Sequence, residues 1–187
     1  MNEPLRDVRD PAEILTSETV FAGLVWNVAR ETAEFGGGTI TREFVVRSGA
    51  VAVLAIDDQE RVLLINQYRH PIRSRDWEIP AGLLDVEGEL PLLAAQRELA
   101  EEADLVAAEW SDPITFHTSP GGSDEVIHLF EARGLSATVA PHDRTDEEAE
   151  IVLRWVSLDE AIEAVLDGRL RNAILMIALL ASRARRG

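Results

Sequence analysis

Residues 80–105, PAGLLDVEGELPLLAAQRELAEEADL, hold the pattern that decides both fold and chemistry. A glycine-bearing turn leads into a predicted helix that carries Arg97, Glu98, Glu101 and Glu102. Residues three and four positions apart share one face of a helix, so the three glutamates point the same way. Three carboxylates on one face repel one another unless a cation lies among them. Hard oxygen ligands of this kind suit Mg²⁺ or Mn²⁺, which keep water molecules for substrate phosphates.

A second, aliphatic stripe runs along the same predicted helix. Its spacing of i, i+3, i+4, i+7 and i+11 is typical of a helix face that packs against a core. The residues at these positions are Leu92, Ala95, Gln96, Leu99 and Ala103. We therefore expect the acidic side chains on one side of the helix and the protein core on the other.

An acidic helix face taken alone favours a solvated surface, because most such faces bind no ligand. The surrounding residues favour a site instead. Gly82, Glu89 and the run Arg97-Glu98-Leu99-Ala100-Glu101-Glu102 resemble the Nudix box, a pattern of Gly, five residues, Glu, seven residues, Arg-Glu, an aliphatic residue, any residue and Glu-Glu. Two positions depart from it: six residues separate Gly82 from Glu89, and Asp104 replaces the glycine at the helix end. Neither departure removes a carboxylate, and Asp tolerates left-handed backbone better than most residues.

Composition and charge limit the class of protein. The chain has 187 residues, 46% of them hydrophobic, which suits one domain with an elaboration. The lack of cysteine excludes disulfides and thiolate metal sites. A net charge of −16 would repel a polyanion such as DNA, and the longest apolar run is too short for a membrane span. Because residues 1–7 also lack the apolar segment of a secretory signal, we expect a soluble, cytoplasmic protein with no nucleic-acid or membrane partner.

The chain is predicted to divide into an arm, residues 1–47, and a main domain, residues 48–187. Within the arm, the apolar and β-branched stretches 19–30 and 39–47 flank Gly36-Gly37-Gly38, which predicts an antiparallel hairpin. A lone hairpin is marginal in water, so we expect the arm to pack on its own core or on a second subunit. Strands of the main domain are predicted at 50–56, 62–68, 77–80, 114–116, 126–131 and 151–156. Ser157 and Glu160 predict the start of a helix that Gly168 ends, and a last helix is predicted at 172–185.

Within the Nudix hydrolases, nearly the whole chain resembles the ADP-ribose pyrophosphatases. This resemblance rests on the β-rich arm, on Gln67-Tyr68-Arg69-His70-Pro71, on residues 77–82 and on residues 119–125, which place Pro120 downstream of the box. It implies an α/β fold, namely a Nudix α/β/α sandwich with a mixed β-sheet plus the N-terminal antiparallel β arm. It also implies a homodimer that uses Mg²⁺, or Mn²⁺, to hydrolyse a small nucleoside diphosphate. The implied substrate is ADP-ribose, and the implied products are AMP and ribose 5-phosphate.

The same resemblance assigns roles at the reaction site. Glu98, Glu101 and Glu102 are expected to bind the metal together with the backbone carbonyl of Ala81, and Glu89 is expected to support them. Arg97 is expected to orient these acids through a salt bridge. A general base is expected on the acidic loop 143–150, where Glu148 is the first choice and Glu147 the next. Most acids in such a run are solvated, so the run alone does not select one.

Four residues are candidates for substrate contacts. Arg42, Arg47 and Arg69 suit phosphate oxygens or the terminal ribose, because a guanidinium binds phosphate in bidentate fashion. Each is also compatible with an ordinary surface arginine. Trp26 lies in the arm, where the subgroup stacks adenine on an aromatic side chain, but an aromatic residue in a strand is more often part of a core.

Two alternative functions stay open. The first is the same reaction on another nucleoside diphosphate sugar, such as a GDP-sugar, because the base-binding pocket cannot be read from the sequence. The second is a non-catalytic module that senses ADP-ribose. The intact set of Glu98, Glu101 and Glu102 argues against this second alternative.

Overall fold

The computed structural model describes residues 4–140, 142 and 150–186. Their contacts divide the chain into two compact units. The first unit contains the residues up to Arg47 together with Ser119–Asp124, and the second contains the rest. The short segment 119–124 was not expected in the first unit. It joins this unit because Val45 pairs with Ser123, and because the Asp124 carboxylate accepts a hydrogen bond of 2.7 Å from the backbone N–H of Arg47.

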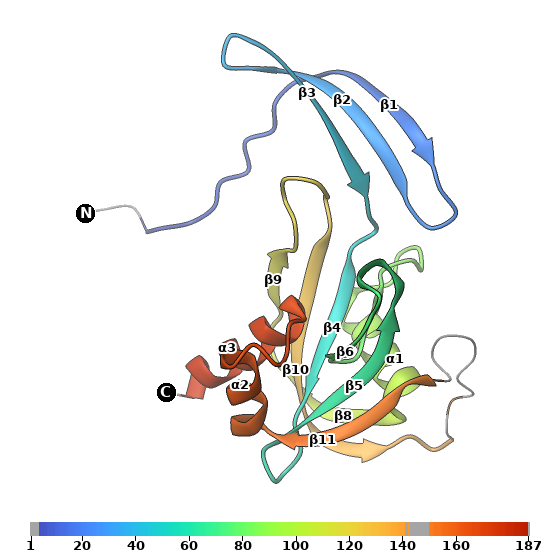
Figure 1. The fold of residues 1–187 in the computed structure, drawn as a ribbon, viewed down its shortest axis with the longest axis vertical. Helices are drawn as coiled ribbons and strands as arrows, with labels where there is room; N and C mark the ends of the chain where they lie inside the picture. The colour runs from blue at the N-terminus through green and yellow to red at the C-terminus, as the bar shows by residue number, and fades with distance from the viewer. Residues whose placement is uncertain (1–3, 141, 143–149, 187) are drawn as a thin grey trace. The chain divides into compact units, whose positions relative to one another are not determined.

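The first unit is a three-stranded antiparallel sheet in the order β1-β2-β3, drawn in blue in Figure 1. The strands are β1 (Ile14–Ala22), β2 (Asn27–Phe35) and β3 (Gly38–Val46). The predicted hairpin is confirmed for β2 and β3, which stay in register along their whole length. The single strand expected over residues 19–30 is wrong. The backbone N–H of Gly23 donates to the carbonyl of Trp26 at 3.0 Å, and this turn splits the stretch between β1 and β2.

Two sheets form the centre of the second unit. The larger has the order β7-β4-β10-β8, with β9 also paired to β10, and it is mixed because β4 and β10 run parallel. Its strands are β4 (Ala50–Ala55), β7 (Ala81–Leu83), β8 (Leu105–Trp110), β9 (Ile114–His117) and β10 (Val126–Ala137). The smaller, antiparallel sheet has the order β11-β5-β6. It contains β5 (Arg61–Arg69), β6 (Ser74–Glu78) and β11 (Val152–Ser157), and a short 3-10 helix, η1 (His70–Ile72), joins β5 to β6.

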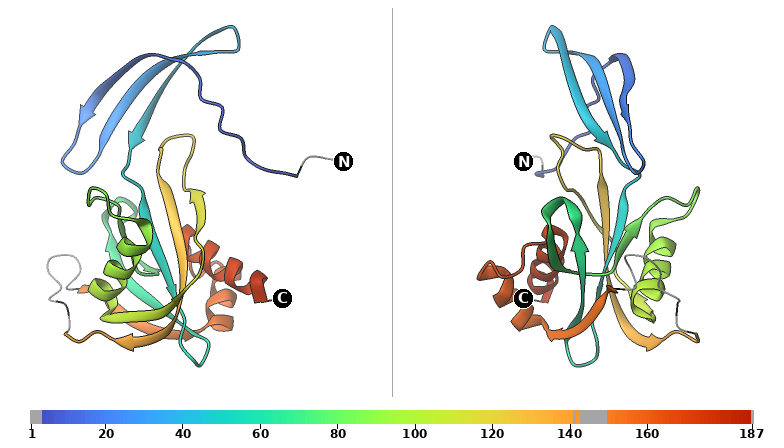
Figure 2. Two further views of the ribbon diagram at one scale, coloured as in Figure 1. Left: turned by 180° about the vertical axis from the view of Figure 1, so that it is seen from behind. Right: turned by 45° about the vertical axis from the view of Figure 1, so that its right-hand side comes forward.

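Strand β4 explains why helices cover both sides of these sheets. All its residues are buried, and successive side chains point to opposite faces. Ala52 and Leu54 enter one apolar cluster, which includes residues of α2 (Leu158–Leu166) and α3 (Ala173–Arg186). Val51 and Val53 enter the other cluster, which includes residues of α1 (Pro91–Ala103). The right-hand view of Figure 2 shows α1 on one side of the sheets and α2 with α3 on the other. The predicted α/β/α sandwich with a mixed sheet is therefore confirmed.

The buried stripe of α1 differs from the expected one. Leu92 and Gln96 are exposed, which corrects the prediction for these two positions. The buried residues of the helix are Ala94, Ala95, Glu98, Leu99, Glu102 and Ala103. The stripe is thus rotated around the helix, and two of the glutamates lie within it instead of on the opposite side.

The predicted helix ends are confirmed. Asp104 follows α1 in the left-handed conformation, with φ of 55°, and its N–H donates to the carbonyl of Ala100 at 3.0 Å. At the start of α2, the N–H of Glu160 donates to the Ser157 hydroxyl at 3.2 Å. No helix in the described ranges combines the length and the apolar character that a membrane crossing requires.

Candidate active site

Glu98 and Glu102 lie against the backbone of Ala81 and Gly82. The backbone N–H of Ala81 donates to a carboxylate oxygen of Glu102 at 2.9 Å. A Cβ atom placed on Gly82 would lie only 2.0 Å from the Glu98 carboxyl carbon. Since real Cβ atoms never approach other atoms so closely, only glycine leaves room for this carboxylate. Two buried acids, one helical turn apart, therefore lie against adjacent residues of β7, Glu102 against Ala81 and Glu98 against Gly82.

Arg97 connects the acids of the site. Its guanidinium donates to both carboxylate oxygens of Glu89, at 3.2 and 2.9 Å, and to Glu98 at 2.6 Å and Glu101 at 3.1 Å. Its hydrogen bonds to Glu89, together with the charge of Glu98, raise the pKa of Arg97 well above its ordinary value. The same hydrogen bonds lower the pKa of Glu89. Glu89 therefore stays ionised at neutral pH and holds Arg97 in place.

The acidic side chains suit a hard divalent cation. Glu98 and Glu102 are 8% and 5% exposed, and burying ionised carboxylates is costly without a compensating cation. In the described ranges, no three or more acidic or histidine side chains converge as a complete metal cage. Mg²⁺ does not need such a cage, because it is usually held by one or two carboxylates, water and substrate phosphates. The donor chemistry of Glu98, Glu102 and the Ala81 carbonyl therefore fits Mg²⁺ or Mn²⁺.

The extra residue between Gly82 and Glu89 is accommodated in a turn. The backbone N–H of Glu89 donates to the carbonyl of Val86 at 3.1 Å, and Gly88, the third residue of this turn, has φ of 78°. A positive φ at this position is typical of a type II turn. The loop is one residue longer than the pattern, yet Glu89 reaches Arg97.

Arg69 is held by an acid that the sequence analysis did not single out. Its guanidinium donates to both oxygens of Glu78, at 2.9 and 2.8 Å, and Glu78 is only 4% exposed. Gln67 also donates to Glu78, at 3.5 Å. Within the run Trp-Glu-Ile-Pro, the alternation of a strand would have placed Glu78 on the face opposite Trp77. That Arg69 of the neighbouring strand would be its partner could not be read from the sequence.

The remaining substrate candidates lie in the first unit. The Arg47 guanidinium lies over the Trp26 ring, 4.5 Å from its centroid, and the Trp26 side chain is 43% exposed. Trp26 is therefore not a core residue of this unit. Arg42 lies apart from this pair in β3, opposite Glu31, and donates to the carbonyl of its neighbour Thr41 at 2.8 Å.

The predicted general bases Glu147 and Glu148 lie outside the described residues. The acid that follows them at the edge of this stretch, Glu150, is described, and it forms an ion pair with Arg75.

Comparison with known proteins places this arrangement in a family. The NUDIX domain model matches residues 46–177. The chain belongs to the Nudix family. In this pyrophosphohydrolase, the residues that resemble the Nudix box lie on α1 and on the segment before it. The match begins at the junction of the two units, so the Nudix domain corresponds closely to the second unit.

Individual relatives extend the similarity over both units. An ADP-ribose pyrophosphatase of Mycobacterium tuberculosis is 41% identical over 90% of this Nudix chain and 82% of its own length. A methanol dehydrogenase activator of Bacillus methanolicus is 37% identical over 88% of this chain and 89% of its own. A solved ADP compounds hydrolase covers 96% of both chains with a TM-score of 0.78 and 22% identity, which shows a shared fold.

Proposed function

We propose that this Nudix enzyme hydrolyses the diphosphate linkage of ADP-ribose and releases AMP and ribose 5-phosphate. The observation that carries the proposal is that two buried carboxylates lie against β7, with Glu102 at the N–H of Ala81 and Glu98 at Gly82. The similarity to the ADP-ribose pyrophosphatase of M. tuberculosis supports the choice of substrate.

The residues around α1 would hold the cation and keep its ligands in position. Glu98 and Glu102, with the Ala81 carbonyl and Glu101, provide the oxygen atoms for Mg²⁺ or Mn²⁺. When bound, such an ion withdraws negative charge from the diphosphate and makes water a better nucleophile. Arg97 keeps Glu98 and Glu101 from turning away, because it is itself anchored on both oxygens of Glu89.

A carboxylate must take a proton from the attacking water. We assign this role to the acidic loop, with Glu148 as the first choice and Glu147 as the second. Glu150 is less suited, since it is paired with Arg75. A general base is typically worth about 10²–10⁴ in rate, so Glu148→Gln should lower kcat by that factor and leave KM nearly unchanged. If Glu148→Gln retains full rate, the assignment moves to Glu147.

Trp26 and Arg47 support recognition of the nucleotide. An exposed indole offers a flat face to adenine, and a guanidinium stacks on aromatic rings or binds phosphate. The Arg47 guanidinium already lies over the Trp26 ring, 4.5 Å from its centroid. Arg42 and Arg69 are assigned to the phosphates or the terminal ribose, with Arg69 held by Glu78.

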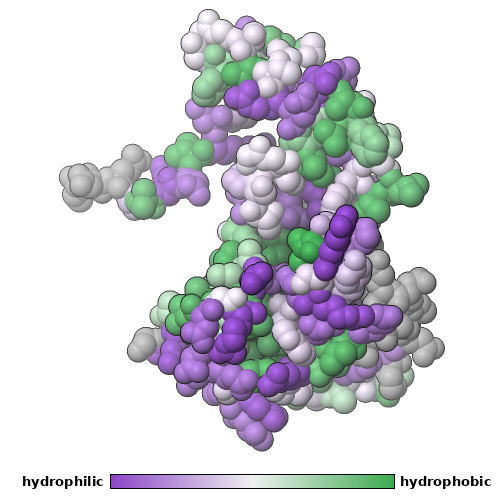
Figure 3. All heavy atoms as spheres, viewed as in Figure 1, coloured by the Kyte–Doolittle hydropathy of each residue, from purple (hydrophilic) through white to green (hydrophobic). Residues whose placement is uncertain are grey.

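A homodimer is part of this proposal, because the first unit exposes many apolar residues. Figure 3 shows green, hydrophobic side chains gathered on this unit. Its exposed large hydrophobic residues include Val20, Phe21, Leu24, Val25 and Trp26. Contiguous exposed patches of this kind mark interaction surfaces. Light scattering should therefore give a mass of about twice 20.6 kDa for the native chain. Phe21→Asp should lower it toward the monomer, and a wild-type monomer at micromolar concentration would reject the dimer.

The decisive experiment is product analysis with Mg²⁺, in which ADP-ribose is compared with GDP-mannose, NADH and a nucleoside triphosphate. We expect ADP-ribose to be hydrolysed faster than the other three compounds and to yield AMP and ribose 5-phosphate. A chelator should stop the reaction. Faster hydrolysis of GDP-mannose would keep the mechanism and replace the substrate. Binding of ADP-ribose without turnover would favour the sensor.

The role of the metal helix is tested by Glu102→Gln, which removes one carboxylate charge at nearly constant volume. Turnover should fall by at least about 100-fold, because a lost metal ligand removes transition-state charge stabilisation. The matched control is Glu163→Gln on an exposed position of α2, which should retain full activity. Equal activity of the two variants would show that α1 does not carry the metal.

A further inference from the structure

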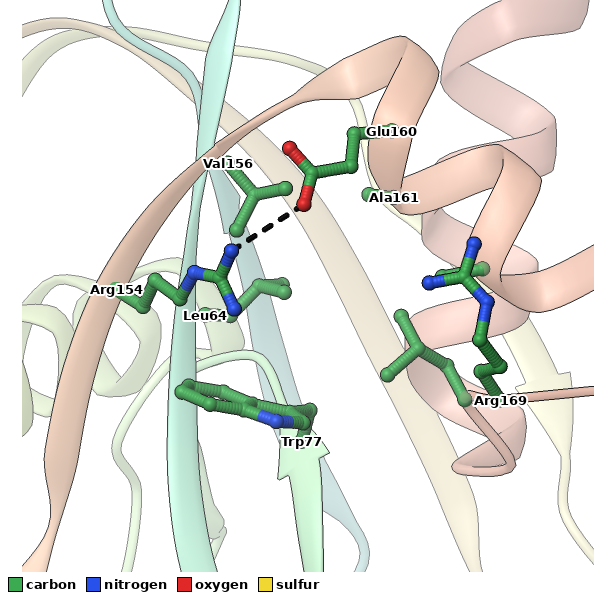
Figure 4. A pocket seen from close by; sticks show the side chains of 9 residues that line it. Leu64, Trp77, Arg154, Val156, Glu160, Ala161 and Arg169 are labelled. Atoms are coloured by element: carbon green, nitrogen blue, oxygen red, sulfur yellow. Dashed lines mark hydrogen bonds and ion pairs between the residues drawn. The ribbon is translucent and has the colours of Figure 1, made fainter.

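A polar cavity lies on the α2 face of the small sheet, on the opposite side of the sheets from α1. It has a volume of about 170 Å³, and its lining includes Trp77, Arg154, Glu160 and Arg169. Figure 4 shows Arg154 and Arg169 on opposite sides of the cavity, with the indole of Trp77 along its floor. None of these residues belongs to the Nudix box or to the substrate contacts assigned above.

The register of the sheet brings these side chains to one face. Arg154 of β11 pairs with Leu64 of β5, and two residues along the same strands Val152 pairs with Asn66. Asn66 in turn pairs with Trp77 of β6. Because side chains separated by two residues share a face, Arg154, Leu64 and Trp77 all point toward α2. The alternate residues Leu63 and Trp155 pack toward α1 instead.

The end of α2 brings the second arginine to the cavity. The chain reverses at Gly168, and the backbone N–H groups of Arg169 and Leu170 both donate to the carbonyl of Ala164, at 2.8 and 3.0 Å. This folds Arg169 back over the last turn of the helix. Leu170 then lines the cavity together with Ala164.

The cavity continues into a larger hollow. This neighbour has a volume of about 630 Å³ and shares Trp77, Arg169 and Leu170 with the first. It adds Arg75 and Arg171 to the lining. Small-molecule sites usually have about 300–1,000 Å³, so the two hollows together, here called the arginine groove, have the size of a ligand site.

Arginines outnumber acids in the lining of the groove, although the whole chain carries −16. The lining arginines are Arg75, Arg154, Arg169 and Arg171, and the lining acids are Asp76 and Glu160. Arg75 is also paired with Glu150, outside the lining. Arg154 forms an ion pair with Glu160 at 3.3 Å, and Arg169 forms one with Asp167 at 3.2 Å. Each of the side chains in these two pairs is more than half exposed. Exposed pairs of this kind contribute only about 0–1 kcal/mol. A doubly charged phosphate would compete well with them for the guanidinium donors.

We propose that the arginine groove binds a small aromatic phosphate monoester, such as a nucleoside monophosphate, at a site separate from the catalytic carboxylates. Arg154 and Arg169 bind the phosphate, and the heterocycle stacks on Trp77. A metal is not required, because guanidinium groups supply the positive charge. The groove and α1 lie on opposite sides of the sheets, so a ligand in the groove does not occupy the catalytic carboxylates.

The test is a titration of the full chain, labelled with ¹⁵N-tryptophan, in chelator and without metal. AMP is the probe, and the four indole N–H signals are assigned with Trp→Phe variants. The Trp77 signal should shift in a saturable way with a Kd below about 1 mM. Adenosine, which lacks the phosphate, and ribose 5-phosphate, which lacks the ring, should each bind at least about tenfold more weakly. A shift of Trp26 alone would place AMP in the first unit and overturn the proposal.

The arginines are tested by the double variant Arg154→Gln/Arg169→Gln, which removes two charges at exposed positions and should fold normally. Its Kd for AMP at Trp77 should rise at least about tenfold. The control Arg183→Gln also removes an exposed arginine paired with an acid, Asp159, at 3.1 Å, but does not line the groove. Unchanged AMP binding by the double variant, or equal loss in the control, would refute the site.

Discussion

Gly82 determines at the residue scale how closely the Glu98 carboxylate can approach the backbone. The space for a side chain at this position is filled by that carboxylate, with the Glu98 Oε1 only 2.1 Å from an added Cβ. This contact explains sterically why the first position of the box is a glycine in this chain. It also means that a single methyl group would displace a proposed metal ligand.

Gly82→Ala should therefore reduce kcat/KM by at least about 100-fold, because Glu98 must move and small displacements of catalytic groups are costly. Steady-state kinetics would measure the loss of activity, and the midpoint of thermal unfolding would measure the change in stability. The midpoint should fall less steeply than the activity, because the atoms nearest to the added methyl group belong to the end of a side chain and not to the backbone. Gly38→Ala, where an added Cβ meets nothing within 4 Å, is the control and should keep full activity. Full activity of Gly82→Ala would contradict the proposed position of Glu98.

At the scale of single elements, the stability of helix α1 depends on the residue that ends it, Asp104. Asp104 adopts φ of 55°, and its carboxylate accepts a hydrogen bond of 2.7 Å from the N–H of His142. Left-handed backbone costs a residue with Cβ about 1–2 kcal/mol, but Asp is tolerated better than most residues. The hydrogen bond adds about 1 kcal/mol of stability. Asp104 therefore replaces the glycine of the pattern and also holds the chain after β10.

Urea unfolding should separate these two contributions. Asp104→Ala should lower the free energy of unfolding by about 1.5–3 kcal/mol, since alanine is strained in the left-handed region and lacks the carboxylate. Asp104→Gly relieves the backbone strain, so its loss should be at least about 1 kcal/mol smaller. Equal losses in the two variants would show that the backbone conformation does not matter here.

The acidity of the chain determines its pH response at the scale of the whole molecule. Lowering the pH from 7 toward the isoelectric point of 4.6 reduces the repulsion among all the acids of the chain. This general change in stability masks the contribution of any single acid. Glu89 has a specific effect, because its hydrogen bonds from Arg97 lower its pKa from the ordinary 4.5. A folded-state pKa below the unfolded value contributes stability that is present above the unfolded pKa and is lost as the pH falls through the folded one.

The difference in the free energy of unfolding between the wild type and Glu89→Gln isolates this effect. It should stay constant above about pH 5.5 and shrink progressively below about pH 4.5. Denaturant unfolding at pH values from 3.5 to 7 would measure it, with the general charge effect cancelling between the two proteins. A difference that grows on acidification would contradict the Arg97–Glu89 bond.

Local chemistry made much of this molecule predictable from its sequence. The 3.6-residue period placed Glu98, Glu101 and Glu102 on a helix, and the glycines at 36–38 marked a hairpin. Ser157 capped α2 as expected, and Asp104 ended α1. Each of these features depends on residues a few positions apart, so the pattern itself contains the cause. The strands β7 and β8 were missed, because β7 has three residues and β8 has no strict alternation of buried and exposed positions.

Contacts between distant parts of the chain were decided only by the tertiary structure. The rotation of α1 that buries Glu98 and Glu102 follows from its packing on β4 and β7, and Ala81 meets Glu102 across 21 residues. The pairing of Glu78 with Arg69 and the arginine groove arise from strand register and from the return of the chain after α2. Local patterns therefore predicted the helix and its carboxylates, which are the basis for proposing a divalent cation. The backbone segment that these carboxylates contact, and the place where the arginines of the groove come together, could be found only from the fold. Long-range packing selects one face of a helix or strand, whereas local propensity does not distinguish the faces.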